Sequence, residues 1–581
     1  MKISKNITKL LMSLYKSIRR FPLSITLSTA FVIVMIFSSE IKPSASRNII
    51  ENLEKISMIL ALGFPLSICT KLYFERKSIV KLAYKASAFI GQGLILIFYY
   101  FFFLKDFNMV STSRYFGVSL VLYLSFIFIP YFKSRENFEL YVTKVFGRLF
   151  ITIIYSIVLY AGLCAILATI DKLLEIKVPS DFYYYTFLIV AGIFSPTYYL
   201  GWLPSIKDKF TKENYSNIFK ILVLYIIMPL ITIYTIILYI YFAKIIITIK
   251  WPVGLVSHLV LWYSVISATV LFFITPIYKE NNFSNKFMKI LPKSILPLIV
   301  LMFFSIAIRI NAYGITENRY YVIALSLWVF GVMIYFSLAK SHRNIFLPVT
   351  LVIIIFISVL GGPLSSYNVS TLSQSLRLEK ILINNNMLKN NNIIKSASIS
   401  QLDKSEINSI LNYFNEDHNL SDIKYLPKNF KIENMVTVFG FSPTQNLIHS
   451  QTNFALNPVQ TGGPIDVIGY DYIFDSRNMN NEKNNSNLSI YYDKTLSTLK
   501  IFQKGNVIYS KDLNETFKNL VNKFGTVEKQ NIINQDDILY EEETPKVKIK
   551  LYLTSLSGTK NSSAQSISIN EFNYYIIIKI K

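Results

Sequence analysis

Long apolar runs separated by short polar segments fill roughly the first 360 residues, whereas the last 215 or so residues contain none. An α-helix rises about 1.5 Å per residue and needs about 20 residues to cross a hydrocarbon core about 30 Å thick. The pattern therefore predicts a polytopic α-helical membrane bundle of about 11 transmembrane helices, followed by a soluble mixed α/β domain rich in sheet. The expected spans cover residues 21–39, 56–72, 86–104, 116–132, 149–170, 182–203, 221–242, 254–277, 294–310, 321–338 and 346–360.

The N-terminal residues before the first span have the pattern of an amphipathic helix. Apolar residues recur there at helical spacing and basic residues lie mostly off that stripe. We expect residues 1–20 to form a cytoplasmic helix that lies on anionic lipids. A cleaved signal peptide is the alternative, but the apolar run that follows is longer than the core of about 7 to 15 residues usual for such a signal.

Lys and Arg are unevenly distributed between alternate connections of the expected spans. About 25 of them lie at the N-terminus and in one set of connections, and about 10 lie in the opposite set. The basic set surrounds Arg76, Arg135, Lys209, Lys286 and Arg343, and the poorer set surrounds Arg47, Lys105, Lys172, Lys250 and Arg319. The positive-inside rule then predicts a cytoplasmic N-terminus. An odd number of spans places the domain that follows outside the cytoplasm.

A Gly-Gly-Pro sequence ends the last apolar run of the membrane domain, which we assign to residues 21–363. Gly362 and Pro363 stop the helix, and a new helical pattern follows with Ser370 expected as its N-cap. Leu372, Leu376, Leu382 and Ile383 share one side of that pattern, and Ser373, Arg377, Lys380 and Asn384 share another. Residues 364–392 are therefore predicted to form an amphipathic linker helix and an Asn-rich loop. A ligand site is the alternative.

The remaining residues, 393–581, are predicted to form an extracytoplasmic α+β domain. Two segments with helical spacing, 405–415 and 513–524, alternate with segments rich in β-branched and aromatic residues. The expected strands cover residues 435–441, 467–474, 488–492, 498–502, 507–509, 547–553 and 574–580, with turns at 504–506 and 557–558.

Composition and charge support this division. The chain is 52% hydrophobic and only 16% charged, against about 25% charged residues in an average soluble protein. Of the net charge of +24, nearly all belongs to the membrane half, where about 36 Lys and Arg stand against about 14 Asp and Glu. These basic residues lie in short loops rather than on one soluble surface, so we expect no nucleic-acid partner. Lipid phosphates are the expected counterions.

Few polar side chains interrupt the expected spans, and no acidic residue lies at mid-span. Gln92, between two glycines, is a candidate intramembrane polar site, as is His258 near the outer end of its span. His258 is either a proton relay or ligand, or a histidine at the membrane interface. Gln92 marks either a broken-helix site or ordinary helix packing. Cys69 and Cys164 both fall within apolar runs, so no disulfide framework is expected.

The densest polar cluster outside the spans follows the ninth one. Arg309 ends that span, Thr316 stands where a helix cap is expected, and Arg319 falls in the first turn of the next helix. A cation at that position opposes the helix dipole. Arg319 is therefore expected to have an anionic partner, either Glu317, Asp171 or a lipid phosphate. An ordinary headgroup anchor is the alternative.

The stretch from Thr316 to Leu378 resembles a bacterial family of multi-pass membrane proteins, catalogued as domain of unknown function (DUF) 4153. The residues that carry the resemblance are Arg319, Tyr320, Trp328, Arg343, Gly362, Pro363, Ser370, Ser373, Gln374, Arg377 and Leu378. Residues 60–66 and 236–259 fit the same family pattern. The resemblance implies an integral membrane protein of bacteria, and we expect it in the cytoplasmic membrane. It implies no activity and no catalytic residues.

Sequence motifs for chemistry are absent, so we expect no cofactor, no metal site and no catalytic residue. His418 and His449 lack companions at metal-binding spacing, and the chain has no phosphate-binding glycine loop. Glu541, Glu542 and Glu543 are expected on a solvated face rather than in a calcium or sugar site.

Three hypotheses about function follow. The first is a non-enzymatic envelope anchor, sensor or scaffold whose outer domain binds an envelope protein or a cell-wall component. The second is a transporter or lipid permease. The third is a membrane-embedded transferase in which Arg309, Arg319 and Arg377 hold a lipid-linked phosphate at the outer face.

Overall fold

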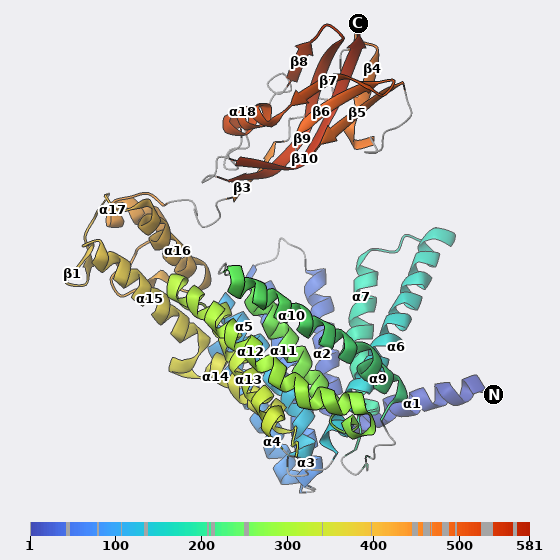
Figure 1. The fold of residues 1–581 in the computed structure, drawn as a ribbon. Helices are drawn as coiled ribbons and strands as arrows, with labels where there is room; N and C mark the ends of the chain where they lie inside the picture. The colour runs from blue at the N-terminus through green and yellow to red at the C-terminus, as the bar shows by residue number, and fades with distance from the viewer. Residues whose placement is uncertain are drawn as a thin grey trace. The chain divides into compact units, whose positions relative to one another are not determined.

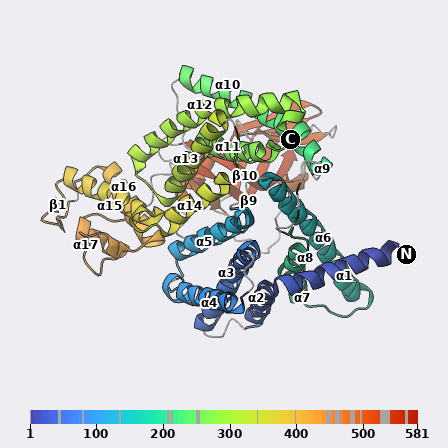
Figure 2. The same ribbon diagram turned by 90° about the horizontal axis from the view of Figure 1, so that it is seen from below.

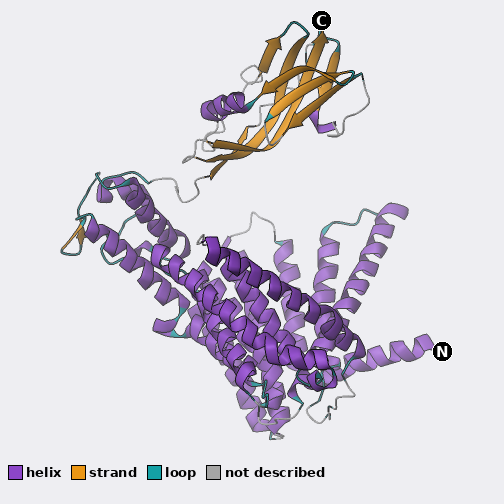
Figure 3. Ribbon diagram, viewed as in Figure 1, coloured by secondary structure: helices purple, strands orange, loops and turns teal. Residues whose placement is uncertain are grey.

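The structure, a computed structural model, divides the chain into two compact units, one helical and one rich in strands (Figure 3). The helical unit contains residues 1–399 and 410–441, and the other contains residues 400–409 and 442–581. The boundary that the sequence suggests, between 392 and 393, thus falls within the helical unit. The described residues are 2–41, 47–77, 81–105, 107–132, 137–205, 208, 210, 215–248, 255–339, 341–396, 398–443, 451–456, 465, 467–478, 487–493, 497–524, 539–561 and 566–581.

The helical unit is a polytopic bundle, as the sequence predicts (Figures 1 and 2). Its helices up to the last span are α1 (Lys2–Arg20), α2 (Pro22–Glu40), α3 (Arg47–Lys77), α4 (Leu82–Phe103), α5 (Met109–Phe128), α6 (Phe138–Leu173), α7 (Asp181–Ile189), α8 (Ser195–Gly201), α9 (Asn217–Ile221), α10 (Met228–Thr248), α11 (Leu255–Ile274), α12 (Asn282–Tyr313), α13 (Glu317–Leu338) and α14 (Phe346–Leu360). The helices that follow are α15 (Ser366–Asn384), α16 (Gln401–Asp417) and α17 (Met435–Phe439).

Nine helices among the described residues are long and apolar enough to cross a bilayer. The other two expected spans also fall on helices. One is α14, which has only 15 residues, and the other is the continuous helical segment formed by α7 and α8 with the π turn between them. Five tyrosines lower the mean hydropathy of that second segment. The predicted number of about eleven is therefore approximate.

Two of the spans contain a π-helical turn just before a proline. Residues Val190–Phe194 precede Pro196, and Leu222–Ile227 precede Pro229. A proline lacks an N–H, and its ring collides with the carbonyl one turn earlier in a regular α-helix. A wider turn relieves this collision without ending the helix.

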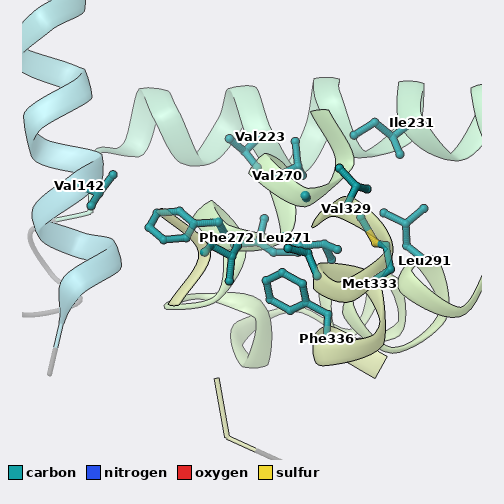
Figure 4. Close-up of a cluster of buried hydrophobic side chains, with 14 of the residues drawn as sticks. Val142, Val223, Ile231, Val270, Leu271, Phe272, Leu291, Val329, Met333 and Phe336 are labelled. Carbon is teal, nitrogen blue, oxygen red and sulfur yellow. The ribbon is translucent and has the colours of Figure 1, made fainter. Parts of the chain in front are cut away.

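The core of the bundle forms where α6, α10, α11, α12 and α13 meet (Figure 4). Leu271, Val329 and Met333 are fully buried there. Elsewhere in the bundle, small residues allow close approach. A Cβ placed on Gly117 of α5 would lie 2.4 Å from a methyl carbon of Val359 in α14. Such small-residue contacts let membrane helices gain van der Waals contact that lipid tails cannot supply.

The N-terminal helix α1 runs outward from the bundle in both ribbon views (Figures 1 and 2). Leu11 and Ile18 of the predicted apolar stripe are exposed, whereas Ser13 and Ser17 are buried. Arg20, the last residue of α1, pairs with an acidic residue of the bundle. Its guanidinium forms a bidentate pair with the Glu75 carboxylate, with N–O distances of 3.0 and 2.8 Å, and so fixes the end of α1 to α3.

The second unit contains two antiparallel sheets, one further α-helix and residues 401–409 of α16. A five-stranded sheet has the order β3-β9-β10-β4, with β8 also paired to β9, and a three-stranded sheet has the order β5-β6-β7. The elements are β3 (Gln451–Leu456), β4 (Tyr472–Asp475), β5 (Leu488–Asp493), β6 (Thr498–Gln503), β7 (Asn506–Asp512), α18 (Asn514–Phe524), β8 (Leu539–Glu543), β9 (Val547–Asn561) and β10 (Ser566–Ile580). Side chains from both sheets and from α18 share one apolar core, in which Phe572 contacts the rings of Tyr492 and Phe517.

Several local predictions for the tail are confirmed and others are wrong. The turn at Lys504 and Gly505 connects β6 and β7, with φ of 48° and 81°. Residues 435–439, expected as a strand, form α17, which Gly440 ends in a left-handed conformation. The expected turn at 557–558 lies inside β9. A Cβ placed on Gly558 would lie 2.1 Å from the Ser568 carbonyl oxygen, so this close approach of β10 requires a glycine. Strands β3 and β8 were not predicted, nor were the two-residue strands β1 (Leu388–Lys389) and β2 (Asn392–Ile393), which pair with each other in the helical unit.

Glu541 and Glu543 of the acidic run in β8 are exposed, as expected of a solvated face, and both lie against lysines. Glu541 pairs with Lys550 at 3.4 Å, and Glu543 pairs with Lys581 at 2.6 Å. Glu542 accepts hydrogen bonds from the phenols of Tyr509 and Tyr540. The run therefore serves the structure of the sheet.

Candidate functional site

The connection between α12 and α13 is held by polar side chains from α13 and α15. Gly314 in this loop has φ of +68°, a conformation that favours glycine. The Gln374 amide donates to the carbonyl oxygens of Tyr313 and Ile315, both at 3.0 Å, and the Ile315 N–H donates to Ser373 Oγ at 2.9 Å. Two of the family-motif residues thus satisfy backbone groups that the loop itself leaves open.

Arg319 and Arg377 both approach this loop. Arg319 Nη1 donates to the carbonyl oxygens of Tyr313 and Gly314, at 3.0 and 2.7 Å, and Arg377 Nη1 lies 3.4 Å from the Tyr313 oxygen. Both guanidinium groups also lie near the Tyr313 ring, at 5.6 and 5.9 Å from its centroid. Two cations therefore converge on one aromatic side chain.

Arg319 pairs with neither of the two carboxylates that the sequence suggests, Glu317 and Asp171. The Glu317 carboxylate lies 2.7 Å from His418 Nε2, and Asp171 pairs with Lys172 at 3.0 Å. Within the described part of the chain, neither Arg309 nor Arg319 has a carboxylate within 4.0 Å. Of the anionic partners that the sequence suggests for Arg319, only a lipid phosphate is left.

Helix α15 begins earlier than the sequence suggests and buries a different face. Its N-cap is Ser365, whose Oγ accepts from the Asn368 N–H, and Ser370 lies fully buried inside the helix. The buried residues of α15 include Tyr367, Ser370, Gln374, Leu378 and Ile381. Leu372, Leu376 and Ile383, expected to pack, are exposed. Gln374 is buried because it binds the α12–α13 loop, which a hydrophobicity pattern does not reveal.

A buried acid, histidine and tyrosine cluster joins α13 to the C-terminal end of α16. His418 Nε2 and the Tyr413 hydroxyl both lie 2.7 Å from Glu317 Oε1, and they lie 2.9 Å from each other. The His418 side chain is only 5% exposed. Burial, together with the negative charge of Glu317, raises the pKa of the Tyr413 phenol far above its ordinary value, so Tyr413 remains a donor.

This cluster was missed because its members are about a hundred residues apart in the sequence. No spacing motif connects Glu317 with His418, and only the fold brings them together. His449, the other tail histidine, lies outside the described residues. In the part of the chain that the structure describes, no group of three or more His, Cys, Asp or Glu side chains is arranged to hold a metal ion.

A polar pocket of about 240 Å³ lies beside the loop and is lined by residues from three helices. Arg309 belongs to the last turns of α12, Ser257 and His258 to the first turn of α11, and Thr316 and Arg319 to the start of α13. The structure thus brings together three candidates from separate segments, namely His258, Arg309 and Arg319. Ser257 was not singled out from the sequence.

The remaining motif residues connect α13 to α14 and to the start of α15. The Tyr320 hydroxyl donates to the Leu364 carbonyl oxygen at 2.6 Å, and Trp328 Nε1 donates to Thr350 Oγ1 at 3.0 Å. Gly362 and Pro363 lie in the short 3-10 turn that separates α14 from α15, and Gly362 has φ of +56°. These contacts hold the last span and α15 against α13.

The intramembrane candidate Gln92 is buried between α4 and α3. Its amide donates to Thr70 Oγ1 and, at 3.4 Å, to the Leu66 carbonyl oxygen. Both groups belong to the neighbouring helix, so Gln92 contributes to helix packing.

Comparisons with known proteins give a family and no activity. An uncharacterised protein of Pasteurella multocida (strain Pm70), PM1469, is 25% identical over 340 residues, which cover 57% of this chain and 55% of that protein. The chain thus spans about half the length of this curated relative. No solved structure matches. The model of the family described as domain of unknown function (DUF4153) matches residues 23–404, well over half of the sequence, and the chain therefore belongs to that family.

Proposed function

We propose that this protein is a non-enzymatic anchor or scaffold of the bacterial cell envelope. In this account the helical unit is held in the cytoplasmic membrane with its N-terminus in the cytoplasm. The strand-rich unit stands outside and binds an envelope protein or a cell-wall component.

The distribution of charge supports this orientation. The connections predicted to be cytoplasmic carry about 25 Lys and Arg and the opposite connections about 10, a bias of the kind that sets membrane topology. The exposed stripe of α1, with Leu11 and Ile18 beside basic residues, fits a helix that lies on an anionic inner leaflet.

The observation that carries the anchoring role is the attachment of the segment after the last span to the membrane helices. Gln374 and Ser373 of α15 bind the α12–α13 loop, and His418 and Tyr413 bind Glu317 at the start of α13. Buried, mutually satisfied polar groups of this kind hold one arrangement. These contacts hold α15 and the end of α16 against the membrane helices.

In-cell crosslinking tests the binding role of the strand-rich unit. Cells expressing the full chain are compared with cells expressing a chain truncated after Phe441, which removes residues 442–581 but keeps the α15 and α16 contacts. We expect the same envelope partner to be crosslinked reproducibly by the full chain and lost on truncation, while the truncated chain remains inserted. Equal recovery of that partner by both chains would show that the strand-rich unit does not hold it.

A further inference from the structure

The polar pocket beside the α12–α13 loop has the electrostatics of an anion site. Two long helices begin at it, because Ser257 and His258 lie in the first turn of α11 and Thr316 is the N-cap of α13. Helix N-termini carry partial positive charge and free N–H groups. The Thr316 side chain makes no capping hydrogen bond. Arg309 and Arg319 add two full positive charges to the same pocket.

Two polar atoms in this pocket have no partner among the described residues. Ser257 is only 4% exposed, yet its hydroxyl makes no hydrogen bond. The Nε atom of Arg309 is likewise buried and without a hydrogen bond. Leaving a buried donor unsatisfied is costly, and more so when the group is charged. A protein tolerates such groups where a ligand satisfies them.

An apolar groove adjoins the pocket. The groove has a volume of about 630 Å³. It lies between α11 and the helical segment that ends in α10. His258 lines both cavities, and Trp262 and Ile266 continue the groove along α11 at intervals of one helical turn. A cationic pocket that shares His258 with an adjoining apolar groove matches an anionic headgroup joined to an acyl chain.

We propose that Ser257, Arg309 and Arg319 bind the phosphate of a membrane lipid whose acyl chain occupies the groove along α11. Arg309 Nε and Ser257 Oγ donate to phosphate oxygens, and Arg319, already fixed by the carbonyl oxygens of Tyr313 and Gly314, adds charge. This site is independent of the anchoring role. A failure of partner capture therefore leaves the lipid site standing, and a failure of lipid binding leaves the anchor standing.

The test is a lipid titration of the full chain, purified in a neutral detergent. Dihexanoylphosphatidylglycerol is the probe, and its dissociation constant is measured for the wild-type protein and for Arg309→Gln. We expect Arg309→Gln to bind about tenfold more weakly, a loss of about 1.4 kcal/mol, because it loses one charge-assisted hydrogen bond. An unchanged dissociation constant would overturn the proposal.

A matched variant controls for general loss of positive charge. Arg343 follows the opposite end of α13, which at 22 residues is about 33 Å long. Arg343→Gln should leave the dissociation constant within about twofold of wild type. An equal loss in both variants would show that binding is non-specific.

Thermal unfolding without lipid tests whether the substitution itself destabilises the fold. Arg309→Gln removes a buried donor that has no hydrogen bond, so its thermal midpoint without lipid should equal or exceed that of wild type. Ser257→Ala supplies a second variant, with a smaller loss of affinity expected. A midpoint that falls together with affinity, in both variants, would mean that these residues stabilise the fold and do not bind lipid.

Inorganic phosphate distinguishes the source of the anion. A lipid ligand predicts that Trp262→Ala weakens phosphatidylglycerol binding, and that millimolar phosphate competes poorly. If phosphate alone binds as tightly as the lipid, and Trp262→Ala has no effect, the ligand is a free anion and the acyl groove is refuted.

Discussion

Gly314 shows how a single position controls the loop on which the site is built. Its φ of +68° is a backbone conformation that glycine adopts readily and other residues rarely adopt. A Cβ there would lie 2.8 Å from the side-chain amide nitrogen of Gln374. We predict that Gly314→Ala lowers the stability of the helical unit by about 1 to 3 kcal/mol, through backbone strain and displacement of Gln374. Thermal unfolding in detergent measures the effect.

A glycine in the middle of α13 is the control for this substitution. A Cβ on Gly331 would meet no atom within 4 Å, so Gly331→Ala should leave stability unchanged or raise it by about 0.5 to 1 kcal/mol. Equal midpoints for the two variants would contradict the role given to Gly314.

Glu542 gives the strand-rich unit a predictable dependence on pH. Partial burial opposes ionisation, but hydrogen bonds from Tyr509 and Tyr540 and the nearby Lys511 lower the pKa of this carboxyl below its ordinary value. The folded state therefore favours the ionised carboxylate. Its contribution to stability is present above the unfolded pKa of about 4.3 and is lost as pH falls through the folded pKa.

Glu542→Gln should accordingly speed hydrogen exchange in β7 and β8 at pH 7. The difference from wild type should shrink as pH is lowered below about 4, because the wild-type carboxyl is then protonated as well. Exchange measured by mass spectrometry across this range checks the prediction. A difference that stays constant down to pH 3 would rule out ionisation of Glu542 as its cause.

At the level of helices, the contact between α5 and α14 depends on a small side chain. The Cβ of an alanine at Gly117 would lie 2.4 Å from Cγ2 and 3.2 Å from Cβ of Val359, so rotation of the valine alone does not relieve the clash. We predict that Gly117→Ala destabilises the helical unit by about 1 to 3 kcal/mol. Gly93→Ala in α4, where a Cβ meets nothing within 4 Å, is the matched control. Similar melting of both variants would argue against close packing here.

Local patterns in the sequence explain which elements could be predicted. Apolar length revealed the spans, and Lys504 with Gly505 revealed a hairpin, because both signals lie within one segment. Strand β8 was missed because three consecutive glutamates become a strand only through pairing with β9 and its lysines. Segment 435–439 was mistaken for a strand because β-branched residues occur in a short helix that tertiary packing stabilises.

Only part of the candidate site could be predicted, because its contacts join segments that are distant in the sequence. Arg309 and Arg319 were singled out as polar residues near span ends, and Ser373 and Gln374 through the family resemblance. Arg319 and Gln374 donate to backbone carbonyl groups and Ser373 accepts from a backbone N–H, and hydrogen bonds to the backbone leave no sequence pattern. The contact of Glu317 with His418 crosses 101 positions of the sequence, so only the folded chain shows it.

For the molecule as a whole, the central claim is that the strand-rich unit stands outside the cytoplasm, carried by helices whose N-terminus is inside. Reporters fused after Lys581 and after Lys279, in the connection between α11 and α12, measure this directly. Alkaline phosphatase is active only outside the cytoplasm, and green fluorescent protein exported through the general secretion route does not fluoresce. We predict phosphatase activity after Lys581 and fluorescence after Lys279. Fluorescence after Lys581, without phosphatase activity, would contradict the account.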